Sequence, residues 1–243
     1  MLEFCSRQPD KSFTLSEIAD SLKLNHGTCA NILKTLVTRK YIEQEGYKKG
    51  YRLGNMSYYL TKNFSSRTSL VELAKPIMKD LCDLLNETVI IATYNKHDNK
   101  RIVLHTELSD QELQVRSRKE KDAYDTSTGR LLIAYLSQRE REEIIRYTGL
   151  PAAHIWKGFS CKEDFIKELD KIKEEQIAFQ KTLTHVMGIA VPVLHRQKAI
   201  ASLGIYLPDI RFQGDLKKII INSLANSAKQ LSDLLDESSN NVL

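Results

Sequence analysis

The segment that decides the fold of the N-terminal region is TLSEIADSLKLNHGTCANILKTLVTRKYI, Thr14 to Ile42. Thr14 and Glu17 have the Ser/Thr-x-x-Glu spacing of a capping box, which begins a helix, and apolar residues then recur at helical spacing. Asn25 is a suitable N-cap for a second helix. Two short amphipathic helices that are separated by the turn KLN predict a helix-turn-helix, a unit that reads DNA.

The second predicted helix has an apolar stripe and a polar face. The stripe is expected to be buried and consists of Cys29, Ile32, Leu33, Leu36 and Val37. The opposite face is expected to point outward and carries Gly27, Ala30, Asn31, Lys34 and Thr38, flanked by His26, Thr28 and Thr35. The first turns of this helix contain no arginine, so the face that would meet DNA is small and mostly uncharged.

A two-stranded hairpin is predicted directly after this helix. YIEQEGYKKGYRLG alternates apolar and polar residues, which favours strands at Tyr41–Glu45 and Tyr51–Leu53 with Lys48 and Lys49 at the tip. The order helix, helix, hairpin is typical of a winged helix. Residues 1–65 hold ten Lys and Arg against six Asp and Glu, whereas the rest of the chain is nearly balanced. The basic excess therefore lies where attraction to phosphates needs it.

Residues 66–243 predict a second domain of the α+β class. We expect a linker helix with a capping box at Ser69 and Glu72 and with Pro76 inside it. The expected strands are 87–95, 100–108, 112–118, 188–196 and 199–208. Further helices are expected at 127–136, from a Ser137 cap to about 148, from a Ser160 cap, and from 215 to about 235, where Leu216, Ile219, Ile220, Leu224, Ala228, Leu231 and Leu235 form a core or subunit interface. The tail from Asp236 is expected to be disordered.

The chain resembles the IclR family of bacterial transcriptional regulators along nearly its whole length. The resemblance rests on four stretches in order: TLSEIADSLKLNHGTCANILKTLVTRKYIE with YRLG, ELAKPIMKDLCDLLNETVIIATYN, DTSTGRLLIAYLS, and GIAVPVLHRQKAIASLGIYLPDIRF. It implies a winged helix-turn-helix domain in residues 1–65, joined by a linker helix to a GAF-like effector-binding and oligomerisation domain in residues 66–243. It also implies a homodimer or homotetramer that binds operator DNA, and an effector that is a small organic acid or an aromatic compound. Because the family has more residues before the point where LEFC begins, we expect Met1 to be a late start.

The same resemblance implies the effector-binding residues. Ser127, Thr128 and Gly129 begin a helix whose amides could hold a carboxylate, and the other family positions are Gln180, Lys181, Gly188, Gly204 and Tyr206. The chain departs from the family here, because Gln180 and Lys181 stand where an acidic residue is frequent, Gly188 stands at a frequent cysteine position, and Gly204 and Tyr206 replace small hydroxyl residues. A pocket that binds no effector therefore stays open as an alternative.

The candidate DNA-binding residues divide into base-reading and phosphate-binding groups. Asn31 can bridge adenine N7 and N6, Lys34 can reach guanine or a phosphate, and Ala30 can touch a thymine methyl while Gly27 allows close approach. This combination favours an A·T-rich site. The residues expected on phosphates are Thr28, Thr35, Arg39, Lys48, Lys49 and Arg52, with His26 beside them at the start of the helix.

Composition argues against several other classes of protein. The four cysteines are scattered singly, which fits a reducing cytoplasm, and we expect neither a signal peptide nor a membrane span. No cofactor is expected, and an enzyme would need a nucleophile–base pair or a metal at recognisable spacing. A metal site across strands, for instance from His105 and His185, stays open. We therefore expect a repressor, with an effector-blind constitutive regulator and, less favoured, a small-molecule enzyme as alternatives.

Overall fold

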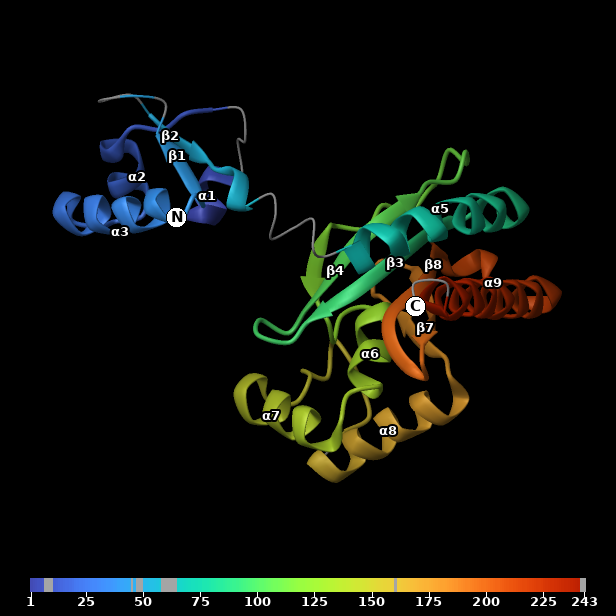
Figure 1. The fold of residues 1–243 in the computed structure, drawn as a ribbon. Coiled ribbons are helices and arrows are strands. Elements are labelled where there is room, and N and C mark those ends of the chain that lie inside the picture. The colour runs from blue at the N-terminus through green and yellow to red at the C-terminus, as the bar shows by residue number, and fades with distance from the viewer. Residues whose placement is uncertain (7–10, 45, 47–49, 58–64, 160, 241–243) are drawn as a thin grey trace. The chain divides into compact units, whose positions relative to one another are not determined.

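The computed structural model describes residues 1–6, 11–44, 46, 50–57, 65–159 and 161–240 (Figure 1). Side chains are described for the same residues except 65–69 and 239–240. The chain divides into two compact units, Met1–Ser69 and Leu70–Leu243. The expected domain boundary at 65–66 lies four residues before this division. Among the described residues no helix is long and apolar enough to cross a membrane.

Unit 1 combines short helices with a two-stranded sheet. Its elements are α1 (Leu2–Ser6), α2 (Leu15–Ser21), α3 (His26–Thr38), β1 (Ile42–Gln44) and β2 (Tyr51–Leu53). The capping box of Thr14 and Glu17 is formed at the start of α2, and the Asn25 side chain caps α3. The two strands pair antiparallel, with Glu43 opposite Arg52.

A small apolar core holds unit 1 together. Its buried members are Cys5, Phe13, Ile18, Ala19, Cys29, Leu33 and Ile42. The prediction that Ile32 is buried is wrong, because 39% of it is exposed. The buried positions of α3 follow a four-residue spacing from Cys29 to Leu33, and Ile32 lies beside that stripe. The predicted hairpin tip, Lys48 and Lys49, lies outside the described residues.

The described part of unit 2 contains a six-stranded antiparallel sheet in the order β5-β4-β3-β8-β7-β6. The strands are β3 (Thr88–Asn95), β4 (Lys100–Glu107), β5 (Glu120–Asp122), β6 (Ala178–Lys181), β7 (Val186–His195) and β8 (Lys198–Pro208). Register places Gly188 opposite Tyr206 and Gly204 opposite both Ala190 and Ile90. Successive residues of a strand point to opposite faces, so Gly188, Gly204 and Tyr206 share one face of the sheet.

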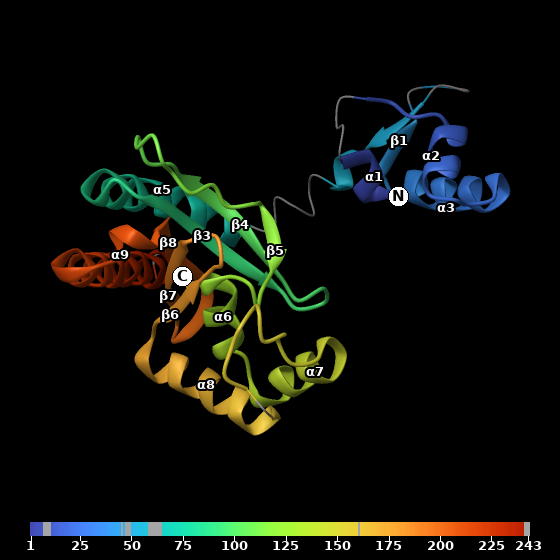
Figure 2. The same ribbon diagram turned by 180° about the vertical axis from the view of Figure 1, so that it is seen from behind.

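Helices cover both faces of this sheet (Figures 1 and 2). On one face lie α5 (Ser65–Leu85) and α9 (Gly214–Asn240), which bury a large apolar cluster against β3, β7 and β8. On the other face lie α6 (Ser127–Ala134), α7 (Gln138–Thr148) and α8 (Lys162–Glu175), which pack around Trp156 and Phe165. The short 3-10 helix η1 (Asp209–Arg211) follows β8. The sheet is therefore the middle layer of three.

Helix caps were predicted with mixed success in unit 2. Ser137 and Glu140 do form a capping box at α7, and Pro76 lies inside α5. Ser69 is not an N-cap, because α5 already begins at Ser65 and neither glycine nor proline interrupts residues 65–75. Ser160 lies outside the described residues, and the N-cap of α8 is Cys161.

Two further predictions about unit 2 are wrong. Residues 112–118 form no strand: pairing with β4 begins only at Glu120, and the carbonyls of Leu113 and Arg118 accept hydrogen bonds from the side chains of Arg211 and Arg101. The tail is not disordered from Asp236, because α9 continues to Asn240, and residues 241–243 lie outside the described part. Leu216 and Ile219 are exposed, whereas the later members of the α9 stripe are buried.

Candidate functional site

The first candidate site is the exposed face of α3. Asn25 Oδ1 accepts a hydrogen bond from the amide of Gly27 at 2.8 Å, which fixes the start of the helix. Cys29 and Leu33 are fully buried and anchor the opposite face. The exposed residues are His26, Gly27, Thr28, Asn31, Lys34 and Thr35, and Ala30 is half-buried. The polar face of α3 is therefore exposed, while its opposite face is packed into the core of unit 1.

Two side chains on this face are free to bind a partner. Within the described part of the chain, the side chains of Asn31 and Lys34 form no hydrogen bond and no ion pair. His26 Nε2 lies 3.6 Å from Asp20 Oδ1. The hydroxyl of Thr35 donates to the carbonyl of Asn31 at 3.1 Å, so it already has a hydrogen-bond partner.

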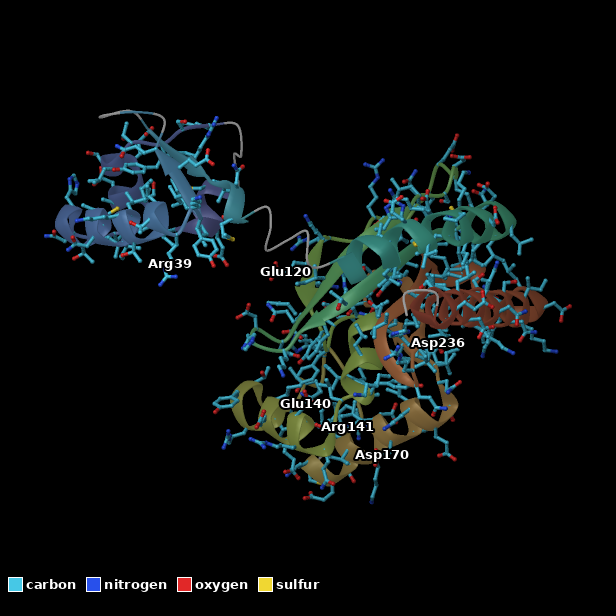
Figure 3. All side chains as sticks on the ribbon, viewed as in Figure 1. Arg39, Glu120, Glu140, Arg141, Asp170 and Asp236 are labelled. Carbon is cyan, nitrogen blue, oxygen red and sulfur yellow. The ribbon has the colours of Figure 1, made fainter. Side chains whose placement is uncertain are left out.

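Predicted phosphate contacts outside α3 have different surroundings. Arg39 follows the helix directly and projects away from unit 1 (Figure 3). Arg52 on β2 lies 3.6 Å from Glu43 on β1, an exposed ion pair between neighbouring strands. Such exposed pairs contribute about 0–1 kcal/mol. Lys48 and Lys49 lie outside the described residues.

The second candidate site lies where the start of α6 meets β7 and β8. Here Ser127 Oγ donates to the Tyr206 hydroxyl at 3.1 Å, and Thr128 Oγ1 shares a hydrogen bond with the same hydroxyl at 3.2 Å. Ser127 and Thr128 are fully buried. A Cβ on Gly188 would come within 2.8 Å of both Ser127 Oγ and a Tyr206 ring carbon, and one on Gly204 within 2.6 Å of the Thr128 methyl. Glycine is therefore required at position 188 by the close packing of Ser127 and Tyr206, and at position 204 by the Thr128 methyl.

The structure packs five of the predicted effector residues closely against one another: Ser127, Thr128, Gly188, Gly204 and Tyr206. The Tyr206 side chain fills the position, and its hydroxyl takes up the hydrogen-bonding capacity of Ser127 and Thr128. The amide of Gly129 is capped by the Thr126 hydroxyl at 3.0 Å. A ligand at this point would have to displace a buried tyrosine.

The two predicted effector residues on β6, Gln180 and Lys181, point to opposite faces of the strand. Gln180 is buried and donates to the carbonyl and the carboxylate of Asp125, at 3.1 and 3.0 Å. Lys181 points to the other face of the strand, and its Nζ lies 2.9 Å from Asp209 Oδ2. The hydrogen bond from Lys181 lowers the pKa of the Asp209 carboxyl, and that from His185 acts in the same direction. Lys181 is thus part of a surface ion pair and does not join the predicted pocket.

A cavity of about 350 Å³ lies beside Tyr206. Tyr206, Gln180 and Thr126 form part of its wall. The remaining lining residues are Arg101, Lys121, Thr182, Thr184, Val186 and the segment 115–118. Arg101 was not predicted from the sequence. Alternate residues of a strand share one face, so Arg101 could have been expected on the same inward face as the apolar Val103.

A buried arginine also supports α6 from the other side. Arg130 Nε donates to the Tyr124 carbonyl at 2.8 Å, and its two terminal nitrogens donate to the carbonyls of Phe179 and Ile155. Its guanidinium lies 4.3 Å from the ring centre of Trp156. Burial lowers the pKa of Arg130 to about 10, so the side chain remains a cation at neutral pH. It ties strand β6 and the loops at Tyr124 and Ile155 to the helix that carries Ser127 and Thr128.

The two histidines of the predicted alternative metal site contact different carboxylates. His105 Nε2 lies 2.7 Å from Glu107 Oε1, and His185 Nδ1 lies 3.2 Å from Asp209 Oδ2. Among the described residues no group of three or more His, Cys, Asp or Glu side chains could hold a metal ion.

Comparison with known proteins assigns the chain to a family. The family model of the bacterial transcriptional regulator IclR C-terminal domain matches residues 63–233, which is well over half of the chain. The chain belongs to the IclR family. It is a member of a family of bacterial transcriptional regulators, as the sequence resemblance predicted.

Relatives of known name agree with this assignment. The regulator KdgR of Dickeya chrysanthemi is 23% identical over 229 residues, which cover 92% of this chain and 74% of the relative. The regulator TtgV of Pseudomonas putida is 25% identical and covers 88% of this chain and 82% of its own length.

Solved structures have the same fold. An IclR transcriptional regulator from Alicyclobacillus acidocaldarius has a TM-score of 0.66 at 20% identity, over 96% of this chain and 95% of its own. An IclR homologue from Microbacterium hydrocarbonoxydans, solved with 4-hydroxybenzoate, has a TM-score of 0.68 at 20% identity, over 93% and 92%. The α+β domain of IclR type is therefore present in unit 2.

Proposed function

We propose that unit 1 is a winged helix-turn-helix that reads operator DNA through α3, in a cytoplasmic regulator whose unit 2 responds to a small molecule. The observation that carries the DNA-reading role is the exposed, capped face of α3, on which the side chains of Asn31 and Lys34 are unengaged within the described residues. The hairpin of β1 and β2 follows directly, as in a wing.

In this proposal the residues of α3 divide their tasks. Asn31 pairs with adenine, Lys34 reaches a guanine or a phosphate, and the small side chains of Gly27 and Ala30 let the helix lie deep in the major groove. Thr28, Arg39 and Arg52, with Lys48 and Lys49, contact phosphates and fix the register of the protein on the duplex. The preferred half-site is then rich in A·T pairs.

We further propose that the regulator acts as a homodimer or homotetramer. Exposed apolar residues on α9, Leu216 at 39% and Ile219 at 49%, support a subunit contact along that helix. A two-fold assembly would place two α3 helices about 34 Å apart, or a multiple of that distance. Light scattering coupled to size-exclusion chromatography measures the subunit number directly.

The test of the DNA-reading role is a selection of random duplex DNA on the purified full chain, at a stated salt concentration. We expect an enriched palindrome with A·T-rich half-sites, whose spacing reports the assembly. Binding that is salt-sensitive but equal for all duplexes would contradict sequence reading by α3.

Two variants separate reading from phosphate binding. Asn31→Ala should reduce the free-energy preference for the correct base at one position by roughly 1–3 kcal/mol, while the affinity for non-specific DNA stays unchanged. The matched control is Gln138→Ala, an exposed amide side chain on α7, which should change neither. An unchanged base preference in Asn31→Ala would exclude its reading role.

The second variant combines Lys48→Ala with Lys49→Ala. It should weaken binding to all duplexes alike and reduce the slope of affinity against salt by about one for each phosphate that is no longer neutralised. Lys171→Ala with Lys173→Ala, two exposed lysines on α8, is the charge-matched control. A weakening confined to the operator would contradict the phosphate role.

One observation favours a second candidate, a regulator that binds its operator constitutively. The site that the family resemblance assigns to the effector is filled by Tyr206, with both facing hydroxyls already hydrogen-bonded. If no small molecule changes operator affinity or melting temperature, this candidate replaces the effector-responsive one.

A further inference from the structure

Ile32 is an exposed apolar side chain in the middle of the helix that we propose to read DNA. Its exposed fraction is 39%, whereas its neighbour Leu33 is fully buried. Successive residues of an α-helix lie ~100° apart around its axis, so Ile32 points to the flank of the exposed face and not into the core of unit 1. Single exposed apolar residues are common on protein surfaces, so the residues around Ile32 decide what it does.

The threonines after Ile32 present methyl groups to the outside. The hydroxyl of Thr35 donates to the carbonyl of Asn31 at 3.1 Å, and that of Thr38 donates to the carbonyl of Lys34 at 2.8 Å. Both threonines are exposed. Because each hydroxyl is turned back onto the helix backbone, the methyl group of each side chain remains on the outer side.

Ile32 and the methyl group of Thr35 form a short apolar strip next to Asn31. Residues three and four apart are neighbours on a helix surface, so Thr35 adjoins both Ile32 and Asn31. We call Ile32 and Thr35 the methyl strip. The sequence of α3 contains neither Asp nor Glu, so no carboxylate of this helix repels a phosphate backbone that approaches the strip.

The methyl strip matches one feature of the major groove. The C5-methyl of thymine is the apolar group among the base edges there, and aliphatic side chains and threonine methyls contact it. A protein partner fits less well, because a stable protein interface covers roughly 800 Å² on each side, far more than two side chains provide. Asn31 at the edge of the strip adds the amide that pairs with adenine.

We propose that α3 recognises the C5-methyl groups of pyrimidines, with Ile32 and Thr35 as specificity-determining residues. The preference for A·T pairs then has two sources, the hydrogen bonds from Asn31 to adenine and the methyl contacts to thymine. It follows that uracil cannot replace thymine without loss, and that methylation of cytosine at C5 strengthens binding at a contacted position. The inference rests on the proposed DNA-reading role of α3, and it specifies the chemical group that is read.

Deoxyuridine in place of thymine tests the inference directly, because it keeps the hydrogen-bonding edge and removes only the methyl group. Each thymine of one half-site of the selected operator is replaced in turn, and the affinity of the full chain is measured by fluorescence anisotropy at constant salt. We expect at least one position at which the affinity falls about three- to four-fold, the factor for one buried methyl-sized group. Unchanged affinity at every position would overturn the inference.

Cytosine methylation tests the same contact on a different base. At a position that is sensitive to deoxyuridine, the T·A pair is replaced by C·G and by 5-methylcytosine·G. The methylated duplex should bind about three- to four-fold tighter than the unmethylated one, since the strip contacts the methyl group whichever pyrimidine carries it. Equal affinity of these two duplexes would contradict methyl recognition and attribute the deoxyuridine effect to the DNA itself.

Variants assign the contact to the methyl strip. In Ile32→Ala the loss caused by deoxyuridine should disappear at one position, whereas the control Ile210→Ala, at an isoleucine of η1 that is 66% exposed, should retain it. Thr35→Ser keeps the hydroxyl that bonds to Asn31 and removes only the methyl, so it tests the strip without altering the helix. It should abolish the loss at a neighbouring position.

Two outcomes of the variant experiment would overturn the assignment. One is weaker binding of Ile32→Ala to every duplex with the deoxyuridine loss intact, because Ile32 would then have only a structural role. The other is an intact loss in Thr35→Ser as well as in Ile32→Ala.

The same experiments separate this inference from the proposed function. An operator that is selected and then bound equally with and without its thymine methyl groups would overturn the methyl contact and leave the DNA-reading role of α3 intact. A chain that selects no operator from random DNA would overturn the DNA-reading role, and this inference with it.

Discussion

Replacing Tyr206 with phenylalanine isolates the contribution of one hydroxyl group to the stability of unit 2. The ring is retained, so its packing against the start of α6 and against β7 survives and no cavity is created. The hydroxyl is removed, and with it the hydrogen bonds to Ser127 at 3.1 Å and to Thr128 at 3.2 Å.

The magnitude follows from the burial of the two partners. Ser127 and Thr128 are both fully buried, so water cannot replace the missing hydroxyl. Each hydrogen bond contributes about 0.5–1.5 kcal/mol net, and an orphaned buried hydroxyl adds a desolvation cost. We expect Tyr206→Phe to lower the free energy of unfolding by about 1–3 kcal/mol. For a unit of this size, each kcal/mol corresponds to a fall in melting temperature of about 2–4 °C.

Urea unfolding followed by tryptophan fluorescence is the suitable assay. The chain has a single tryptophan, Trp156, which is buried in unit 2, so the signal reports this unit and not unit 1. The comparison requires equal slopes of the free energy against urea concentration in wild type and variant.

A triple variant that carries Tyr206→Phe, Ser127→Ala and Thr128→Val provides the control. It removes every member of the network and leaves no buried hydroxyl orphaned, so it should regain most of the stability that Tyr206→Phe removes. If Tyr206→Phe alone were as stable as wild type, the region would be hydrated and the conclusion that Tyr206 closes this site would be refuted.

Three further predictions concern neighbouring residues. Gly188→Ala should destabilise unit 2 by about 1–3 kcal/mol in the same urea assay, since the new Cβ meets the Tyr206 ring; a double variant with Tyr206→Ala should be destabilised by less than the sum. Arg130→Met should cost roughly 3 kcal/mol or more, because three carbonyls are deprived of a charged donor, and a cost below about 1 kcal/mol would contradict its supporting role. Lys181 lowers the pKa of Asp209, so the native state holds that proton less tightly than the unfolded chain does. The stability that the ionised Asp209 gains from Lys181 is complete above about pH 4, and it is lost as the pH falls through the pKa of Asp209 in the native state. The free energy of unfolding, measured in urea from about pH 6 to about pH 3, should therefore fall less steeply with pH in Lys181→Met than in wild type.

The local features of this protein could be predicted from short stretches of sequence. The capping boxes at Thr14 and Ser137, the Asn25 cap and the paired strands β7 and β8 each depend on residues within one or two turns or one hairpin. Ser69 shows the limit of this reasoning, since a cap signature inside a longer run of helix-forming residues does not begin the helix.

The candidate sites depend on contacts between segments that are far apart in the chain. Sequence spacing identified the polar face of α3, because a helix face is a local pattern, although the exposure of Ile32 was not foreseen. The sequence could place Tyr206 near Ser127 and Thr128 only through a family resemblance, and it could not say that the ring fills the space between them. That outcome is set by strand register, which places Gly188 opposite Tyr206 and leaves room for the ring.

The sequence by itself determined the division into an N-terminal helix-and-hairpin region and an α+β region, the caps at Thr14, Asn25 and Ser137, the basic excess of the N-terminal region and the family. Only the tertiary structure decided which polar groups lie together. Arg101 and the segment 115–118 are separated along the chain, and they meet with Tyr206 at one cavity because β4, β3 and β8 are neighbours in the sheet. The physical reason is that burial and charge compensation are properties of packed neighbours, and the chain specifies these neighbours only once strand order and register are fixed.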